Sequence, residues 1–477
     1  MSKFISNLKL FLFSIILISS QSYYIQEGED SSKIITNFTF GSNYYGRYLK
    51  EEDIFQTIIT HRPNLWIWLG NAVYLDKPKF NYFANSIDKT DWNFTKLLYQ
   101  KVKNNKYYKK LSEKVPVIGT WGDEEYGVSN GDGEHSYKES YKQYYLDFLD
   151  ADVLDQRRNY VNTGIYSTYS FGKGDKTVRF ILLDLKYNQT SYLKEEEKYD
   201  MLGDDQWEWL EKIFKSKKET YTFICVSNQI LPNDRFIIKK WYAESRKRLF
   251  DLIGKYKRSG VVFLSGGLGF SQILKTFCPL PKIGYNLYEC TSSGLSHSNK
   301  FTSFLNNFYH NDYLIEGQNF NGINFGQVKI NWGEKNEIKT SYIELEIYDI
   351  NDNLVSNVRV NYTDLLYKDN TSDYYSNEAN MKDIRYMNVY DGNSCEREIY
   401  HRVRTPFMNI RYYFTHVTKL PVGIATAAFI IFFCNMLLRK RFYFLLFVML
   451  LCFVIYCLFY LFDLLNFVLF KKKIMNE

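Results

Sequence analysis

The feature that most restricts the fold of this chain is an apolar run that stops abruptly in a glycine-rich loop. Residues 261–264 are β-branched, aromatic or aliphatic, and the segment SGGLG (265–269) follows at once. This pattern is typical of a buried strand that ends in a tight loop at the carboxyl edge of a sheet. Ligands of α/β sheets usually bind at that edge. The loop therefore has the shape of a binding site, yet it holds no carboxylate, imidazole or thiolate for chemistry.

The same pattern occurs four more times along the chain, in an order that predicts an α/β fold. Apolar runs at residues 35–40, 64–69, 115–121 and 221–226 each lead into a loop of small or polar residues. Helical periodicity predicts helices over residues 51–61, 91–111, 137–154, 202–214 and 244–256. Further strands are expected over residues 166–171, 177–185, 285–290, 326–332 and 340–348. We therefore predict that five strand ends meet at one edge of a layered sheet.

The N-terminal segment indicates the compartment. Residues 1–22 have Lys3 and Lys9, an apolar stretch and then small residues, which is the layout of a secretory signal peptide. A mitochondrial presequence is the alternative, because no acidic residue precedes Glu27. We expect a membrane of the secretory pathway or the cell surface, with the body of the protein lumenal or extracellular, or else a mitochondrial membrane.

The C-terminal segment predicts a membrane anchor. Residues 420–438 are apolar and uncharged, and they are followed by the basic triplet 439–441 and a second apolar stretch, 442–470. A helix needs about 20 apolar residues to cross a bilayer, so we expect one or two transmembrane helices within residues 419–470. Asp463 lies in the second stretch, and an acid at bilayer depth usually has a partner. We expect residues 30–350 to form the globular domain and residues 351–418 to be a linker or stalk.

Charge, cysteine positions and sequons give three further predictions. The net charge is +7, but the basic residues are dispersed and no nucleic-acid motif is present, so we predict no nucleic-acid binding. Cys278 and Cys290 flank a Pro-containing loop and are the first disulfide prediction. Five N-x-S/T sequons predict glycosylation at Asn37, Asn93, Asn188, Asn361 and Asn370.

Eight ordered motifs resemble those of the PhoD-like (alkaline phosphatase D) metallophosphatase family, over roughly residues 35–348. They are FGSN (40–43), PNLWIWLGNAVY (63–74), IGTWGDEEYG (118–127), LLDLKYN (182–188), LGDDQWEWL (202–210), VVFLSGGLGFSQI (261–273), TSSGLSHS (291–298) and NFGQVKINW (324–332). The resemblance implies a layered β-sheet (αββα) metallophosphatase-like domain.

The resemblance also implies that the metal-binding positions are substituted. Where the family has a metal-site cysteine, carboxylates and histidines, this chain has Asn43, Asn71, Gly122, Glu124, Gly267 and Gly269. Two metal ions held near each other need anionic bridging ligands, which amides and glycines do not supply. We therefore expect no metal cofactor, or at most one weakly held Ca²⁺ or Mg²⁺.

Three functions follow as hypotheses. The first is a membrane-anchored pseudophosphatase that lacks the binuclear site and binds an unknown protein or a phosphorylated ligand. The second is a residual metal-dependent phosphomonoesterase or phosphodiesterase that uses the remnant residues Asp123, Glu124, Glu125 and His297. The third is a subunit of a membrane complex, motivated by Asp463.

Overall fold

The structure is a computed structural model that describes most of the chain between residues 27 and 368. The described residues are 27–45, 53–74, 92–127, 131–159, 163–191, 199–216, 219–232, 241–276, 279–280, 282–298, 313–334 and 337–368. The chain divides into two compact units, Met1–Val403 and Arg404–Glu477, and all described residues belong to the first. The predicted signal peptide, both apolar C-terminal stretches and Asp463 lie outside the described residues. Within the described ranges, no helix is both long enough and apolar enough to cross a bilayer.

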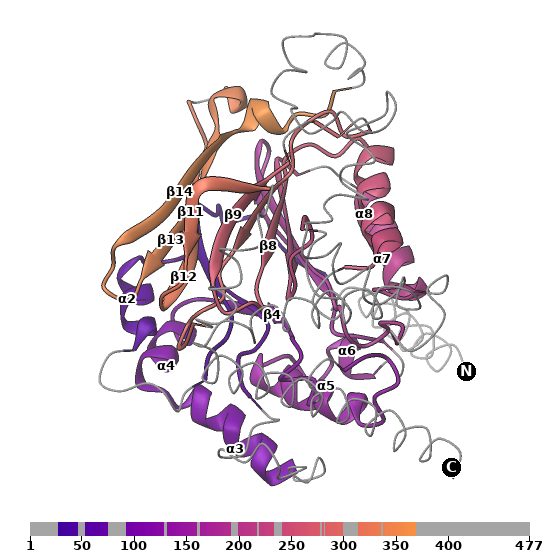
Figure 1. The fold of residues 1–477 in the computed structure, drawn as a ribbon, viewed down its shortest axis with the longest axis vertical. Coiled ribbons are helices and arrows are strands. Elements are labelled where there is room, and N and C mark those ends of the chain that lie inside the picture. The colour runs from indigo at the N-terminus through magenta and orange to yellow at the C-terminus, as the bar shows by residue number, and fades with distance from the viewer. Residues whose placement is uncertain are drawn as a thin grey trace, which may run out of the picture. The chain divides into compact units, whose positions relative to one another are not determined.

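Two mixed β-sheets form the centre of the fold (Figure 1). The six-stranded sheet has the order β14-β13-β12-β2-β3-β4, and the eight-stranded sheet has the order β1-β5-β6-β7-β8-β10-β9-β11. Strands β2, β3 and β4 run parallel to one another, as do β6, β7, β8 and β10. Because parallel strands end at the same edge of their sheet, the loops that follow these strands are brought together.

The strands of the six-stranded sheet are β2 (Asn37–Gly41), β3 (Trp66–Leu69), β4 (Val117–Thr120), β12 (Asn324–Asn331), β13 (Tyr342–Asp349) and β14 (Leu354–Asn361). Those of the eight-stranded sheet are β1 (Glu27–Asp30), β5 (Ser167–Lys173), β6 (Lys176–Leu182), β7 (Tyr221–Val226), β8 (Val261–Ser265), β9 (Ser271–Lys275), β10 (Tyr288–Thr291) and β11 (Leu314–Phe320). The helices are α2 (Ile54–Thr60), α3 (Trp92–Lys103), α4 (Lys106–Ser112), α5 (Lys138–Phe148), α6 (Gln156–Asn159), α7 (Asp204–Lys215) and α8 (Ala243–Lys255).

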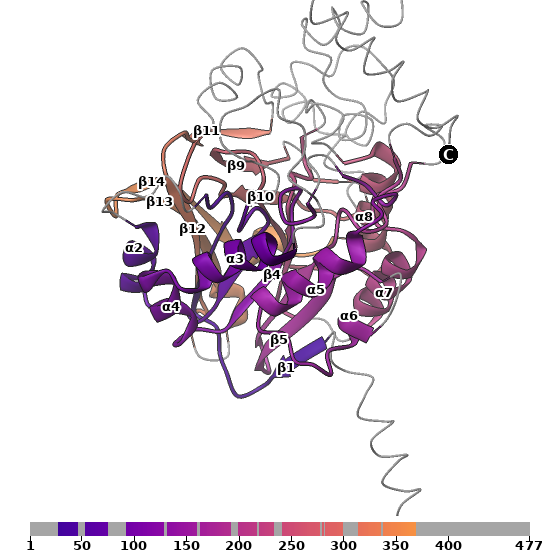
Figure 2. The same ribbon diagram turned by 90° about the horizontal axis from the view of Figure 1, so that it is seen from below.

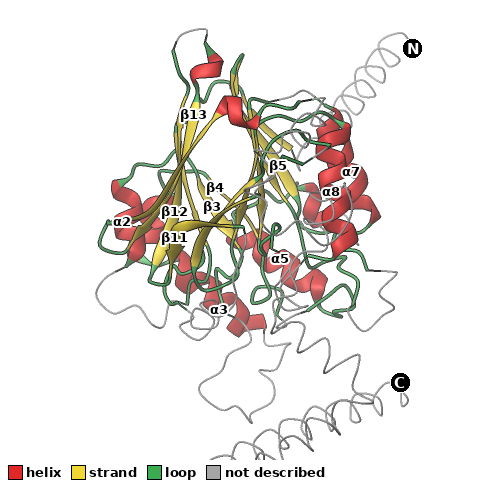
Figure 3. Cartoon of the chain, turned by 45° about the horizontal axis from the view of Figure 1, so that its top comes forward, coloured by secondary structure: helices red, strands yellow, loops and turns green. Residues whose placement is uncertain are grey.

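Helices cover the two outer faces of the paired sheets. In Figure 3 the strands lie in the middle, with α2 on one side and α7 and α8 on the other. The two sheets contact each other through Phe38, whose ring centroid lies 4.8 Å from that of Phe180 and 4.9 Å from that of Phe223. Trp66 and Trp68 point to the opposite face, where they pack with residues of α2 to α5. Figure 2 shows α3, α4 and α5 from that side. The predicted layered α/β architecture is therefore confirmed.

The structure divides the predicted helix over residues 91–111 into α3 and α4. Asn105 makes this break, because its side-chain oxygen accepts the backbone amides of Tyr107 and Tyr108 at 2.9 and 3.0 Å and so caps a new helix. Asp53 caps α2 in a similar way by accepting the amide of Phe55 at 3.0 Å.

Two sequence predictions need correction. Residues 351–418 were expected to be a linker, yet β14 pairs along its length with β13 and buries Ser356 and Val360. The weak alternation of this segment hides a strand because most of its other side chains face solvent. Cys290 is a free thiol that lies buried on β10, which is contrary to the predicted disulfide with Cys278, a residue outside the described ranges.

Candidate functional site

The five predicted strand ends converge, as the parallel arrangement requires. A Cβ atom built on Gly70 would lie 2.9 Å from both the amide nitrogen of Gly122 and the Cβ of Ser227. A Cβ on Gly266 would lie 2.3 Å from the carbonyl oxygen of Leu69 and 2.6 Å from the hydroxyl of Ser42. The loops after β2, β3, β4, β7 and β8 are therefore packed backbone to backbone. We call these loops, residues 42–45, 70–74, 121–127, 227–229 and 266–269, the rim.

Two neutral amides occupy the first part of the rim. Asn43 and Asn71 both have left-handed backbone conformations, with φ of 63° and 55°. Asparagine tolerates this conformation better than most residues with a side chain. The Nδ2 of Asn71 donates to the Oδ1 of Asn43 at 2.9 Å, and both residues are buried. The two predicted degenerate metal positions thus bind each other through uncharged groups.

Glu125 is a structural brace between two rim loops. Its carboxylate accepts the backbone amides of Asn71 at 2.8 Å and Gly122 at 2.9 Å, and also that of Ala72. Burial raises the pKa of Glu125 to about 7, although these amide donors act in the opposite direction. The carboxylate is engaged with backbone and is not directed at an open site.

Asp123 forms an ion pair with Lys186, and both side chains are almost fully buried, at 4% and 1% exposure. The ammonium of Lys186 also lies 3.5 Å from the carbonyl oxygen of Gly131. The negative charge of Asp123 is therefore balanced by a cation that belongs to the chain itself. Sequence reasoning missed this lysine, although it lies within the motif LLDLKYN. Glu124, the third consecutive acid, is also buried.

Asp184, in the same motif, is a hydrogen-bond anchor. It accepts the indole N–H of Trp121 at 2.8 Å and the backbone amides of Ile165, Lys186 and Tyr187 at 2.8 to 3.0 Å. Burial raises its pKa, while these donors lower it. The residue holds Trp121, at the end of β4, and the chain around Lys186 in place.

Close packing requires glycine at two of the positions predicted to be degenerate metal positions. A Cβ on Gly122 would lie 2.2 Å from the Oδ1 of Asn71, and one on Gly267 would lie 2.2 Å from the carbonyl oxygen of Ser227. Gly267 and Gly269 also have positive φ angles of 76° and 85°. The amides of Leu268 and Gly269 both donate to the hydroxyl of Ser293 at 2.8 Å. The glycine loop is thereby attached to the loop TSSGLSHS.

His297 takes part in a short polar chain beside the rim. Its Nε2 lies 3.1 Å from the hydroxyl of Tyr74, and its Nδ1 lies 3.1 Å from the hydroxyl of Ser296. That hydroxyl in turn donates to the carbonyl oxygen of Asn43 at 3.3 Å. Three of the four remnant candidates, Asp123, Glu125 and His297, are thus held by different partners. In the described part of the chain, no group of three or more His, Cys, Asp or Glu side chains could hold a metal ion.

Three uncharged polar atoms of the rim are buried without a hydrogen-bond partner among the described residues. They are the Oδ1 of Asn71, the Oγ of Ser227 and the Nδ2 of Asn228. Buried polar groups normally find a partner, commonly an ordered water. Both donors and acceptors are present in this set, so it suits ordered water.

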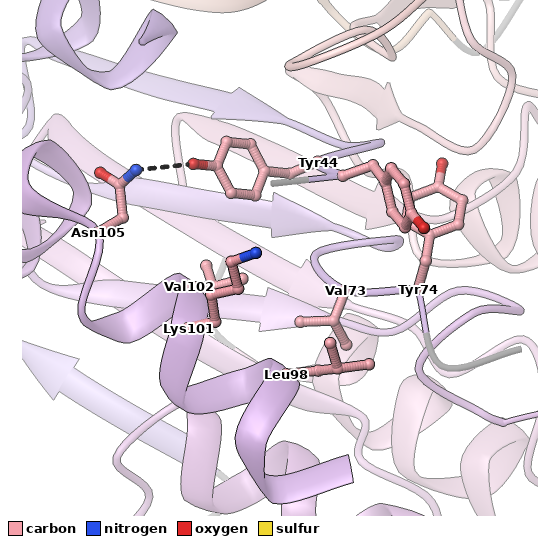
Figure 4. A pocket seen from close by; sticks show the side chains of 8 residues that line it. Tyr44, Val73, Tyr74, Leu98, Lys101, Val102 and Asn105 are labelled. Carbon is pink, nitrogen blue, oxygen red and sulfur yellow. Dashed lines mark hydrogen bonds between the residues drawn. The ribbon is translucent and has the colours of Figure 1, made fainter. Parts of the chain in front are cut away.

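A pocket of about 250 Å³ adjoins the rim (Figure 4). Two rim loops form one wall, with Tyr44, Tyr45, Val73 and Tyr74. Helix α3 and the residue that caps α4 form the other wall, with Leu98, Lys101, Val102 and Asn105. We call it the aromatic pocket. Sequence reasoning did not find it, because the two halves of its lining are far apart along the chain.

The predicted glycosylation sites differ in exposure. Asn93 and Asn361 are exposed, Asn37 and Asn188 are half-buried, and Asn370 lies outside the described residues. The Nδ2 of Asn37 donates to the carbonyl oxygen of His61 at 3.0 Å, so one of its two N–H groups is already used. Glycosylation stays a prediction.

Comparisons with known proteins found similar proteins only among solved structures. No protein-family model and no curated protein matches the chain. PhoD is 13% identical over 69% of each chain, with a TM-score of 0.48. A putative 5′-nucleotidase from Staphylococcus aureus, solved with α-ketoglutarate, is 12% identical over 72% of this chain and 58% of its own, with a TM-score of 0.32. The protein TT1561 of Thermus thermophilus is 8% identical over 69% of this chain and 99% of its own, with a TM-score of 0.31. Identities this low bear on neither substrate nor activity.

Proposed function

We propose that this chain is a membrane-anchored PhoD-like pseudophosphatase, in which the rim acts as a binding surface. The observation that carries the proposal is the ion pair between Asp123 and Lys186. A metal ion would need a free carboxylate at this position, but this one is already paired with the ammonium group of the lysine. A binuclear phosphatase requires anionic ligands that bridge two cations and lower the pKa of the attacking water. The residues present at the rim do not fit such a pair of ions, so we derive no hydrolytic step.

The other rim contacts support the same proposal. Glu125 would have to release three backbone amides before it could coordinate a cation. Asn43 and Asn71 carry no charge, and the Nδ2 of Asn71 donates to the Oδ1 of Asn43. The alternative of a residual phosphoesterase around Asp123, Glu124, Glu125 and His297 is disfavoured by these contacts, since each rearrangement leaves a buried polar group without its partner.

Metal content and phosphoester hydrolysis test the proposal directly. The purified full-length chain is assayed for bound metals by mass spectrometry and for hydrolysis of 4-nitrophenyl phosphate and bis(4-nitrophenyl) phosphate with Mg²⁺, Ca²⁺, Mn²⁺ or Zn²⁺. We expect less than one tightly held metal ion per chain and no turnover above the background of an Asp123→Ala variant. Two bound metals together with turnover that Asp123→Ala abolishes and the exposed control Glu113→Ala retains would overturn the proposal.

The membrane location is a separate part of the proposal, and it rests on the apolar stretches within residues 419–470. We expect the full chain to stay with membranes after alkaline carbonate extraction. A version that ends at Thr418 should be released from them. Release of the full chain would contradict the anchor without affecting the interpretation of the rim.

A further inference from the structure

We infer that the aromatic pocket binds a small aromatic carboxylate. The inference rests on the proposed function and deepens it, because it names a ligand class for the rim. The pocket starts immediately after the two substituted positions: Tyr44 and Tyr45 follow Asn43, and Val73 and Tyr74 come two and three residues after Asn71. The loops that would present metal ligands in a phosphatase therefore present aromatic and aliphatic side chains here.

Apart from Lys101 and Asn105, the pocket is lined by aromatic and aliphatic side chains. The rings of Tyr45 and Tyr74 pack edge to face with centroids 5.1 Å apart, and the Tyr44 ring is almost fully buried. The polar atoms of Asn105 are already used, because its Nδ2 donates to the Tyr44 hydroxyl at 3.0 Å and its Oδ1 caps α4. Figure 4 shows this bond at one end of the pocket. A bound molecule would therefore meet mainly apolar surface at that end.

Lys101 supplies the charge. It is the only charged residue among those described in the lining, and it forms no ion pair with any described residue. In Figure 4 its amine points away from α3, into the space between this helix and Tyr74. Lys101 is exposed to solvent. A single ammonium there complements a single negative charge. A carboxylate suits it better than a dianionic phosphate, for which several donors are usually gathered.

The volume sets the size of the ligand. A cavity of about 150 Å³ is enough for benzene. The aromatic pocket, at about 250 Å³, therefore has room for one ring with a short acidic tail. Aromatic walls of this kind bind a ring by offset or edge-to-face contacts.

Binding of 3-phenylpropionate to the purified full-length chain tests the inference. We expect saturable one-to-one binding by isothermal titration calorimetry, with a Kd of roughly 0.1–1 mM for a ligand of this size. Leu98→Trp should fill the pocket and abolish binding. Lys101→Gln should weaken binding of the acid at least about fivefold but leave binding of the neutral amide, 3-phenylpropionamide, unchanged.

The matched control is Lys96→Gln, an exposed lysine on the same helix that is not part of the lining. It should bind the acid as the native chain does. The thermal unfolding midpoints of Leu98→Trp and Lys101→Gln are compared with that of Lys96→Gln. Equal midpoints show that a loss of binding comes from the pocket and not from unfolding. Absence of saturable binding to the native chain, or equal binding by Leu98→Trp, would overturn the inference. Neither outcome affects the metal and hydrolysis assays, which decide the proposed function on their own.

Discussion

The backbone amide of Asn71 donates a 2.8 Å hydrogen bond to the carboxylate of Glu125, a buried acid in the next strand-end loop. The same carboxylate accepts the amide of Gly122 in its own loop, so one side chain connects the ends of β3 and β4. The Glu125 carboxylate is therefore engaged with backbone amides of two loops.

Glu125→Gln is expected to destabilise the chain by about 2–3 kcal/mol at pH 8, because the NH₂ group of glutamine would face backbone N–H groups that lose their acceptor. Urea unfolding followed by circular dichroism measures the change. The control Glu208→Gln removes an exposed acid that pairs with Lys212 on α7, and it should change stability by less than about 0.5 kcal/mol. Equal effects of the two variants would contradict the role of Glu125 as a brace.

The stability contributed by Glu125 should fall as pH rises. Burial raises its pKa from an ordinary 4.5 to about 7, so between these values the unfolded chain has lost a proton that the folded chain keeps. The free energy of unfolding then decreases with pH through this window and levels off above it, by about 3 kcal/mol in all. Subtracting the pH profile of Glu125→Gln from that of the native chain isolates the effect. If the difference between the two profiles is flat or rises between pH 4.5 and 7, the pKa of Glu125 is not raised in the folded chain.

Gly122→Ala should be destabilising by about 1–3 kcal/mol, since its Cβ would fall 2.2 Å from the Oδ1 of Asn71. The cost should shrink in an Asn71→Gly background, where the obstructing side chain is gone and the positive φ at position 71 is still accommodated. A double-mutant cycle from chemical unfolding measures this coupling. Additive effects would mean that positions 71 and 122 are energetically independent.

Lys186→Met should be strongly destabilising, by about 3–5 kcal/mol, because it leaves the buried carboxylate of Asp123 without its counter-ion. Adding Asp123→Asn should recover part of the loss, since the unpaired charge is then removed as well. Unfolding free energies of the two single variants and the double variant provide the measurement. A double variant no more stable than Lys186→Met would argue against a coupled ion pair.

Much of the architecture could be predicted from local patterns. The strands before Asn43, Asn71, Gly122 and Gly267 were recognisable because apolar runs ended in small or polar residues. The break at Asn105 was missed, because a single capping residue interrupts an otherwise helical pattern. Strand β14 was missed because an edge strand buries few side chains.

The amino-acid order by itself determined the strands that lead into the rim loops, because periodicity and turn chemistry are local properties of a chain. Only the tertiary structure decided what the acids at that rim do. Asp123, after β4, reaches Lys186, which follows β6 of the other sheet, so this ion pair depends on how the two sheets pack. Glu125 reaches the amides of the loop after β3 because β3 and β4 are neighbouring strands. The aromatic pocket has the same origin, since its walls come from separate segments that only the folded chain brings together.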